Sequence, residues 1–471
     1  MGRLETSRDL NLIRKDVNSS DPGGNMTKTQ IRGLLLATAV SLSSAAQAKV
    51  GKDEAAKLGK ELTPVGAERA GNSDGSIPAW KPAAQRGAIS GEFPSNPEID
   101  GDKPMFTITQ ANYEQYADKL DAGKRELFKR FDSYKMKVYP SHRLVNFPKE
   151  VLDASVANAT TAELKGSDLL VNAKLGFPFP IPKNGAEPIW NHRLKYRGDN
   201  VRRYNNQMIV QTSGDFQFTK IVEDVKFYYA NITEPGPVGE SAITLKYLSE
   251  TLSPPRLAGT FILVHEKVDT RDAWLYSPGL RRIRRAPTVC CDNPAEGTDG
   301  HQFYDQVDMF NGTLERYNWK LLGKREMYIP YNSNFISGPE VSYEEIAAPK
   351  HLNQEFPRYE LHRVWVVEAN VKEGTNHSIA KRVFYIDEDS WNIVAVDGYD
   401  GRGDLFQYQE GHHVFAYNML LTGTVPEVIY HFNSGRYFVT AMANEDRAVD
   451  FSVKFRESDF EAPSVQRRTN R

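Results

Sequence analysis

Leu361-His-Arg-Val-Trp-Val-Val-Glu-Ala-Asn-Val371 is the stretch that decides the fold. Successive side chains of an extended strand point to opposite faces, so the odd-numbered residues here share one face and the even-numbered residues share the other. The segments 381–387 and 391–399 repeat this pattern, and Asp387-Glu-Asp-Ser390 between them reads as a hairpin turn. Short connections of this kind favour antiparallel pairing.

The same signature recurs along the chain from about residue 205 onward. The segments are rich in Val, Ile, Tyr and Phe, which suit strands, and the whole chain holds 22 Tyr and 23 Phe. The number of these candidate strand segments predicts a large antiparallel sheet. The candidate strands are 206–213, 216–229, 242–252, 257–268, 273–277, 280–285, 314–330, 359–371, 381–387, 391–399, 426–432 and 435–441.

Helical signals gather in the N-terminal third, at 49–62, 109–131 and 148–164. We therefore predict the α+β class, with a large curved antiparallel β-sheet on which these helices pack. Residues 49–105 are expected to form an extended arm, and 106–471 a single large domain. A sheet this long curls or closes. A curled sheet covered by helices leaves an apolar interior that can hold a ligand.

An export signal precedes this body. It begins at Met26 with a positive region, continues through the apolar run 34–42 and ends in Ala46-Gln-Ala48, a small-residue cleavage pattern. We predict a signal peptide over 26–48 that is cleaved near Ala48, and a periplasmic address. Residues 1–25 are expected to be a mis-assigned extension outside the fold. No Cys follows the apolar run, so no lipid anchor is predicted there.

Composition excludes some partners and leaves one question about cysteine open. The formal net charge of the 471 residues is −2, which gives no reason to expect nucleic-acid binding. The two cysteines, Cys290 and Cys291, are adjacent in sequence. In an oxidising compartment they could close a vicinal disulfide, and the alternative is two unrelated thiols.

Residues 272–287 form the most distinctive segment, with two strand pieces around Ser277-Pro-Gly279. Trp274 and Tyr276 point to one face of the first piece. The second piece is crowded with arginines, whose guanidinium groups suit phosphate or carboxylate headgroups. The alternative is an edge strand kept soluble by its charge. The arginines are Arg281, Arg282, Arg284 and Arg285.

A second basic cluster precedes the first long strands. It can meet an anionic lipid or a transporter, or it can be a solvated face. Its members are Arg193, Lys195, Arg197, Arg202 and Arg203, with Asp199 the one acid between them.

No metal and no cofactor is predicted. The acidic residues between Asp292 and Asp308 lack a standard ligand spacing, so a solvated loop is expected there. His412-His413 has no acid at metal-ligand spacing and is interpreted as structural or surface. The chain has no H-E-x-x-H, no P-loop and no G-x-G-x-x-G. We therefore predict that the protein is not an enzyme.

Several motifs carry a family resemblance that covers nearly the whole chain after residue 48. The segment at 272–287 resembles the strand–turn–strand of the periplasmic lipoprotein carriers LolA and LolB. The chain is more similar still to the proteobacterial family of unknown function number 1329, which is described as outer membrane lipoprotein-sorting protein-like. The motifs are Leu62-Thr-Pro-Val-Gly-Ala-Glu-Arg-Ala-Gly71, Ile77-Pro-Ala-Trp80, Cys290-Cys-Asp-Asn-Pro294, Asp308-Met-Phe-Asn-Gly312 and Trp319-Lys-Leu-Leu-Gly-Lys-Arg-Glu-Met-Tyr-Ile-Pro-Tyr331.

The resemblance implies a half-barrel of antiparallel strands, a lipid-sized cavity and a periplasmic address. It also implies a partner, because such proteins are often encoded beside RND/MMPL-type transporters. We therefore expect a carrier or chaperone for a lipid or another hydrophobic molecule, in traffic to the outer membrane. A structural adaptor without cargo and a periplasmic hydrolase are the alternatives. Trp274, Tyr276, Leu280 and Ile283 are expected to line or rim the cavity, and the four arginines at 281–285 to meet headgroups or a partner.

Overall fold

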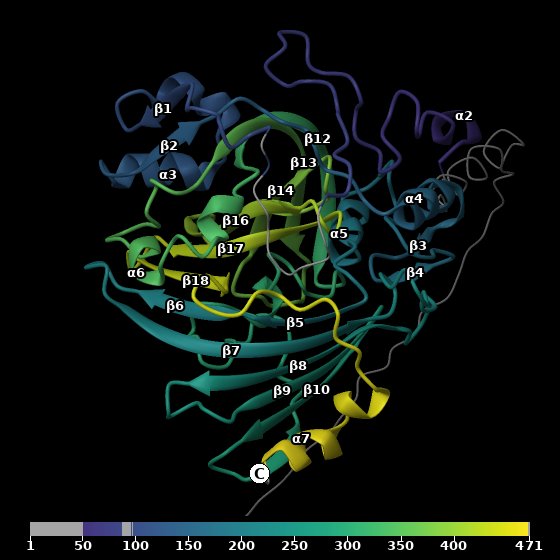
Figure 1. Cartoon of the computed structure of the whole chain (residues 1–471), viewed down its shortest axis with the longest axis vertical. Coiled ribbons are helices and arrows are strands. Elements are labelled where there is room, and N and C mark those ends of the chain that lie inside the picture. The colour runs from purple at the N-terminus through teal and green to yellow at the C-terminus, as the bar shows by residue number, and fades with distance from the viewer. Residues whose placement is uncertain (1–49, 87–95, 97, 470–471) are drawn as a thin grey trace, which may run out of the picture. The chain divides into compact units, whose positions relative to one another are not determined.

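The computed structural model describes residues 50–86, 96 and 98–469 (Figure 1). The predicted extension at 1–25 and the predicted signal peptide at 26–48 lie outside the described residues. In the part of the chain that is described, none of the helices has the length and apolar character needed to cross a bilayer.

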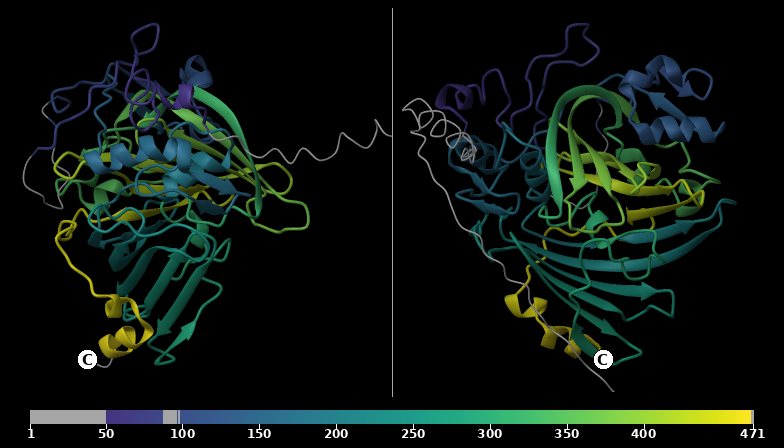
Figure 2. Two further views of the ribbon diagram at one scale, coloured as in Figure 1. Left: turned by 90° about the vertical axis from the view of Figure 1, so that its right-hand side faces the viewer. Right: turned by 180° about the vertical axis from the view of Figure 1, so that it is seen from behind.

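A single sixteen-stranded sheet dominates the fold (Figures 1 and 2). Paired strands are antiparallel throughout, apart from one parallel pair between β2 and β13. The sheet is open, with β1 (Phe106–Thr109) at one end of the strand order and β11 (Arg282–Arg285) at the other. The predicted α+β class with a large antiparallel sheet is therefore confirmed. The strand order is β1-β2-β13-β14-β15-β16-β17-β18-β6-β7-β8-β9-β10-β11, with β12 paired to β13 and β5 paired to β7.

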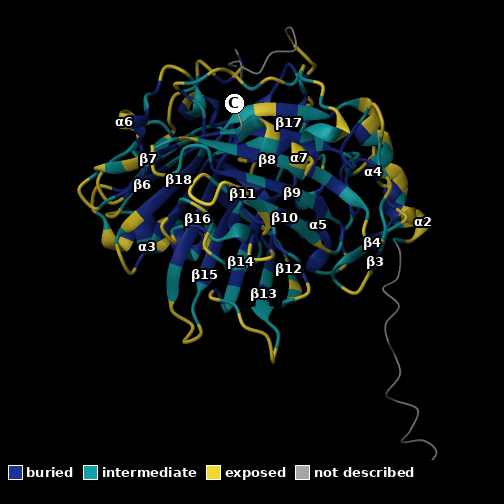
Figure 3. Cartoon of the chain, turned by 90° about the horizontal axis from the view of Figure 1, so that it is seen from below, coloured by how far each residue is buried: buried dark blue, intermediate teal, exposed yellow. Residues whose placement is uncertain are grey.

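Two halves of this sheet differ in what covers them. We call β12–β16 the packed half, because nearly all side chains of β13–β16 are buried or half-buried and exposed residues gather on turns and outer helices (Figure 3). Its strands are β12 (Tyr317–Pro330), β13 (Tyr359–Val371), β14 (Lys381–Asp387), β15 (Ile393–Tyr399) and β16 (Leu405–Ala416).

The cavity half comprises β5–β11 together with β17 and β18. Its outer strands, β7–β11, fan away from the packed half (Figure 2). They are β5 (Asn200–Tyr204), β6 (Asn206–Val210), β7 (Phe216–Phe227), β8 (Ile243–Ser253), β9 (Phe261–Lys267), β10 (Arg271–Ser277), β17 (Leu421–His431) and β18 (Arg436–Met442).

The helices are short, and the two longest, α3 and α4, lie before β5. Strand β2 (Lys135–Val138) belongs to the large sheet. Strands β3 (Glu163–Lys165) and β4 (Leu169–Val171) form a separate two-stranded sheet. The helices are α2 (Lys52–Ala55), η1 (Tyr113–Lys119), α3 (Ala122–Arg130), α4 (Lys149–Thr161), α5 (Ala186–Arg193), η2 (Tyr304–Gln306), η3 (Asn334–Ser337), α6 (Tyr343–Ile346), η4 (Glu457–Phe460) and α7 (Ala462–Thr469).

The helix predictions hold in part. The helix at 148–164 is present as α4, whereas the one at 49–62 shortens to α2. The one at 109–131 divides into η1 and α3. Asp121 lies at the break, where its carboxylate accepts a hydrogen bond of 2.7 Å from the backbone N–H of Lys124 and so starts a new helix.

Strand β16 was missed by the sequence prediction for a physical reason. Its middle carries Gln407, Gln409, Glu410, His412 and His413, all of them buried. Polar side chains on both faces remove the apolar alternation that marks a half-buried strand. The neighbouring strands β15 and β17 pair with it on either side and enclose these groups.

Candidate functional site

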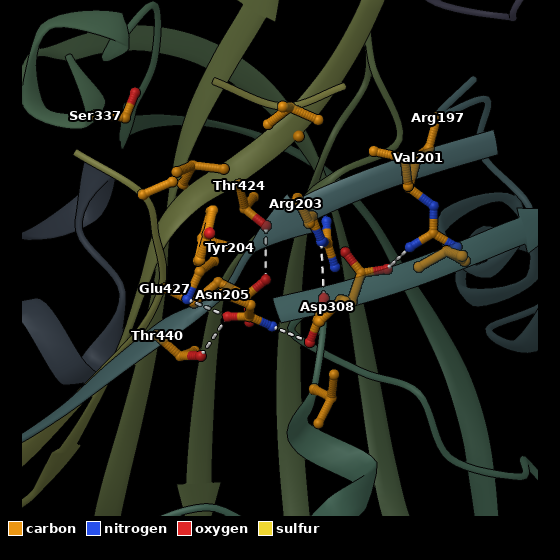
Figure 4. A pocket seen from close by; sticks show the side chains of 18 of the residues that line it. Arg197, Val201, Arg203, Tyr204, Asn205, Asp308, Ser337, Thr424, Glu427 and Thr440 are labelled. Atoms are coloured by element: carbon orange, nitrogen blue, oxygen red, sulfur yellow. Dashed lines mark hydrogen bonds and ion pairs between the residues drawn. The ribbon is translucent and has the colours of Figure 1, made fainter. Parts of the chain in front are cut away.

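A cavity of about 1080 Å³ opens on the inner face of the cavity half. Its walls come from β5, β7, β8 and β9, from the start of β17, and from the loop 286–311 (Figure 4). Much of the wall is hydrocarbon. Apolar side chains on it include Val201, Val225, Phe227, Leu245, Ile262 and Val264.

Strand alternation decides which side chains reach the cavity. On β8, Leu245, Tyr247 and Ser249 line it, and on β9 Ile262 and Val264 do so. The residues between them point the other way. The sequence pattern therefore divides the side chains of each strand between two faces, and the tertiary structure decides which of the two faces borders the cavity.

The opposite face of β8–β10 is closed by the C-terminal segment. Phe460 of η4 and Val465 of α7 pack there in a cluster with Leu248, Phe261, Leu263 and Tyr276. Trp274 and Ile283 are partly buried against this same cluster. The alternation of Trp274 and Tyr276 is as expected, but these side chains lie under α7 and not on the cavity wall. Leu280 is 48% exposed in the β10–β11 turn.

The four arginines at 281–285 lie on or beside the edge strand β11 and are not among the residues that line the cavity. Arg281 occupies the turn before β11, with a φ of 50°. Arg285 lies over the Trp274 ring at 5.5 Å and pairs with Asp272 at 3.1 Å. The placement matches the edge-strand alternative, and contact of these arginines with a headgroup or a partner stays a prediction.

The second basic cluster provides the charged part of the cavity wall, which sequence reasoning left unassigned. Arg193, Arg197 and Arg203 line the cavity, and Lys195 is buried behind them. Arg202 points outward and pairs with Asp224 at 2.6 Å. The cluster is therefore largely internal and not a solvated face.

Helix α5 ends at Arg193, and Lys195 and Arg197 follow it directly. Its Asn191 side chain donates to the Phe179 carbonyl and accepts from the Phe179 N–H, both at 2.8 Å, which fixes the helix to the preceding Pro-rich segment. His192 accepts from the Ile393 N–H at 3.0 Å and donates to the Asp308 carbonyl at 2.7 Å. Burial lowers the pKa of His192 to about 3, so this imidazole is neutral.

Two carboxylates organise the cations on the wall. Glu266 pairs with Arg193 at 3.1 Å and with Arg271 at 2.5 Å. Asp308 pairs with Lys195 at 2.9 Å and with Arg197 at 2.5 Å, and Figure 4 shows Arg197 reaching toward it. Although burial acts to raise it, the pKa of Asp308 is held below its ordinary value by these cations.

Protonation states follow from burial. Burial lowers the pKa of Lys195 to about 8 against the opposing effect of Asp308, so the ammonium is still mostly charged at neutral pH. Burial and the Asp308 charge raise the pKa of Glu427 to about 8, so this carboxyl is mostly protonated there. Glu427 accepts from Thr424 Oγ1 at 3.1 Å, a contact visible in Figure 4.

One group among the described residues has the geometry to hold a metal ion. His362, Asp387 and Asp389 are buried, and one ligand atom from each lies within 4.8 Å of the others. Both Asp389 oxygens already accept from Arg143, at 2.7 and 2.8 Å. Burial and the Asp389 charge raise the pKa of Asp387 to about 7. This group does not line the cavity.

The acidic stretch at 292–308 is solvated only in part: Glu296 and Asp299 are exposed, and the other acids contact the protein. Asp292 accepts from the Ser378 N–H at 2.8 Å. Asp305 pairs with Arg382 at 2.7 Å. These contacts hold the loop 286–311 over the cavity, which gives the stretch a structural role.

Cys290 and Cys291 are free thiols in this structure, with their Sγ atoms 2.7 Å apart. Burial raises the pKa of the Cys291 thiol to about 12. Whether they form a vicinal disulfide in an oxidising compartment stays a prediction.

A hydrolase-like G-x-S-x-G pattern does occur, at Gly71-Asn-Ser-Asp-Gly75. A catalytic serine in this motif sits between a strand and a helix. Here Ser73 is an exposed turn residue of the N-terminal arm, with neither element beside it. The pattern therefore indicates no nucleophile.

An open antiparallel half-barrel around a partly charged cavity defines the class of this protein. The chain belongs to the family described as protein of unknown function DUF1329, whose profile matches residues 107–466. The predicted membership is thus confirmed. An uncharacterized protein of Pseudomonas aeruginosa is 44% identical over 429 residues, which covers 89% of this chain and 94% of the relative.

Two solved structures show lower similarity. One is a domain from Vibrio parahaemolyticus assigned provisionally to outer membrane lipoprotein sorting. Its TM-score is 0.41 at 15% identity, covering 60% of this chain and 98% of the domain. The other is a LolA superfamily protein from Nitrosomonas europaea, with a TM-score of 0.35 at 11% identity. That match covers 58% of this chain and 94% of the other.

Proposed function

We propose that the protein is a carrier that holds a lipid or another hydrophobic molecule in its cavity and performs no chemistry on it. The observation that carries this proposal is the cavity of about 1080 Å³ beneath a wall rich in hydrocarbon. Small-molecule sites typically enclose about 300–1000 Å³. Each buried methylene group stabilises a bound chain by about 0.8 kcal/mol, so a long acyl chain would be retained against water.

The two alternatives make different demands on the interior. A structural adaptor without cargo is favoured by a solid interior, and this one is hollow. A hydrolase most often uses histidine as general base. Among the described residues that line the cavity there is no histidine. Both observations favour the carrier.

The proposal includes a periplasmic address and a transporter of the RND/MMPL type that exchanges cargo with the protein on its way to the outer membrane. The predicted signal peptide supports the address, and the family resemblance supports the partner. Expression in a Gram-negative host followed by N-terminal sequencing tests the address. Cleavage near Ala48 is expected, and an uncleaved cytoplasmic product contradicts it.

A fluorescent apolar probe tests whether the cavity takes hydrocarbon. Ser249 lies on β8 and lines the cavity, so Ser249→Trp should place an indole in it and obstruct the path of a bound chain. Leu252 lies at the end of the same strand and is 38% exposed, so Leu252→Trp is the matched control. We expect saturable probe binding in the wild type and the control, with at least a tenfold loss in Ser249→Trp. Equal binding by all three proteins contradicts a carrier that uses this cavity.

A further inference from the structure

At the end of the cavity beside α5, two carboxylates each serve two cations. Glu266 is shared by Arg193 and Arg271, and Asp308 is shared by Lys195 and Arg197. Each carboxylate can neutralise one cation, so each set keeps one positive charge.

The nearby acids do not remove this excess. Glu223 pairs with Arg203 at 2.9 Å, so its charge is already balanced by that arginine. Glu427 is mostly protonated at neutral pH, and its ionisation would leave one positive charge uncompensated. Asp168 acts on Arg193 only at longer range.

Other acids on the cavity wall either have cations of their own or are exposed at the rim. Asp102, Glu355 and Asp446 pair with Arg358, Lys135 and Lys220, in that order. The exposed ones are Asp100, Glu296 and Glu340.

Arg193 shows where the excess charge lies. Its side chain is only 6% exposed, and among the described residues its Nη1 has no hydrogen-bond partner. Leaving a buried donor unpaired costs about 1–3 kcal/mol, and more for a charged group. An arginine fork matches the paired oxygens of a carboxylate or a phosphate. The Arg193 guanidinium also lies over the Trp190 ring at 4.5 Å. A carboxylate or phosphate oxygen would supply the acceptor that Nη1 lacks.

Hydrocarbon begins directly beside this charge. Arg197 lies over the Phe227 ring at 5.0 Å, and Phe227 lines the cavity together with Val201 and Val225. A ligand that satisfies both surfaces has an anionic head and an apolar tail.

We propose that this end of the cavity binds the head of an anionic amphiphile, meaning a carboxylate or phosphate group attached to a hydrocarbon chain. The inference rests on the proposed carrier function and names the chemical class of its cargo. Arg193, Arg197 and Arg271 hold the head, and the apolar side chains of β5–β9 hold the tail.

Direct titration of the full-length, delipidated protein tests the inference with four probes: hexadecanoate, hexadecyl phosphate, hexadecan-1-ol and inorganic phosphate. We expect both anionic amphiphiles to bind at least about tenfold tighter than the alcohol, since hydrogen bonds to charged groups contribute about 1.5–3 kcal/mol. Inorganic phosphate should bind far more weakly than hexadecyl phosphate.

The remaining outcomes separate this inference from the carrier proposal. Equal affinity for acid and alcohol overturns the anionic head and leaves the carrier standing. If inorganic phosphate binds as tightly as hexadecyl phosphate, the site takes a free oxyanion and the amphiphile is wrong. If no tailed probe binds, the carrier proposal fails and this inference with it.

Three variants localise the effect. Arg193→Gln should weaken hexadecanoate binding about tenfold while hexadecan-1-ol stays within twofold. Arg202→Gln removes an arginine from the outer side of the same cluster, 48% exposed, and should change neither. Glu266→Gln removes a carboxylate and leaves both of its cations, so it should tighten hexadecanoate binding severalfold. Unchanged affinity in both cavity variants contradicts the assigned site, and the opposite signs guard against a folding defect.

Discussion

The packed half and the cavity half treat buried charge in opposite ways. Against the packed half, Lys124 of α3 is completely buried between Asp121 at 2.7 Å and Glu410 of β16 at 3.1 Å. Burial raises the pKa of Glu410 and favours its uncharged form, so one cation is paired with one carboxylate. In the cavity half, Arg193 and Arg271 divide one carboxylate between them. A buried charge is costly unless it is paired. The packed half is complete by itself, and the cavity half is completed by a ligand.

Packing differs in the same direction. On β15, Ile393 lies in the main core with no exposed surface. On β9, Ile262 is half-buried because its side chain faces the cavity. Both strands have the alternation of an ordinary sheet. What covers each face, and not the strand pattern, separates a core from a binding site.

Removing one buried cation from each half should give the largest difference in the free energy of unfolding between the two halves. Lys124→Gln strands Asp121 in the core and should lower the free energy of unfolding by about 3–5 kcal/mol. Arg193→Gln leaves Glu266 paired with Arg271 and should cost no more than about 1 kcal/mol, because it removes uncompensated charge. Urea unfolding of the ligand-free proteins measures both. Equal losses would break the distinction between balanced and unbalanced charge.

The same deletion in each half tests the packing. Ile393→Ala should cost about 2–5 kcal/mol, as expected for a fully buried side chain that leaves a void. Ile262→Ala only enlarges an existing cavity and should cost about 1 kcal/mol. Chemical denaturation with matched m-values gives the comparison. A cost for Ile262→Ala as large as that for Ile393→Ala would indicate a filled interior.

Acid should destabilise the packed half through His412. Burial lowers its pKa from 6.5 to about 3, so between these values the unfolded state binds a proton that the folded state does not. Stability is therefore complete above about pH 6.5 and falls as the pH drops toward 3. His412→Leu should remove up to about 1.4 kcal/mol of this loss per pH unit. A pH series of urea midpoints measures the slope, and an unchanged slope in the variant contradicts a neutral buried His412.

Glu427 should give the cavity half the opposite slope. Burial raises its pKa from 4.5 to about 8, so the folded state keeps a proton that the unfolded state loses in this window. Stability is complete below about pH 4.5 and declines as the pH rises to 8. Glu427→Gln should flatten the curve by up to about 1.4 kcal/mol per pH unit. The same pH series serves here, with Glu340→Gln at the exposed rim as control.

The smallest effect should come from the edge arginines. Replacing Arg281, Arg282, Arg284 and Arg285 with Ser should change stability by less than about 0.5 kcal/mol each, because these are exposed positions. Retention of a cavity probe should stay within twofold, whereas binding to anionic vesicles should fall. Loss of both ligand retention and vesicle binding would reassign these arginines to the cavity. Loss of neither would leave them as an edge kept soluble by charge.

Strand alternation predicted most of the fold, because it is a local property. The strands at 359–371 and 381–387 were placed at their observed bounds. Strand β16 could not be predicted from the sequence because Gln407, Glu410 and His412 interrupt the apolar alternation. These side chains are buried by partners that are far away in sequence.

Strand alternation predicted less of the candidate site than of the fold. Trp274 and Tyr276 were correctly placed on one face, but the sequence does not say that α7, almost two hundred residues later, covers that face. The cations of α5 and the residues after it were noticed only as a cluster. Their role depends on Glu266 and Asp308, which reach them through the tertiary fold.

Native mass spectrometry of gently purified protein tests the central claim most directly, namely that the cavity half is hollow and holds an amphipathic molecule. We expect the wild type and Leu252→Trp to carry one bound anionic amphiphile that collisional activation releases, and Ser249→Trp to carry much less of it. Wild-type protein that shows only the mass of the bare chain, and that gains no mass when hexadecanoate is added, would contradict the account.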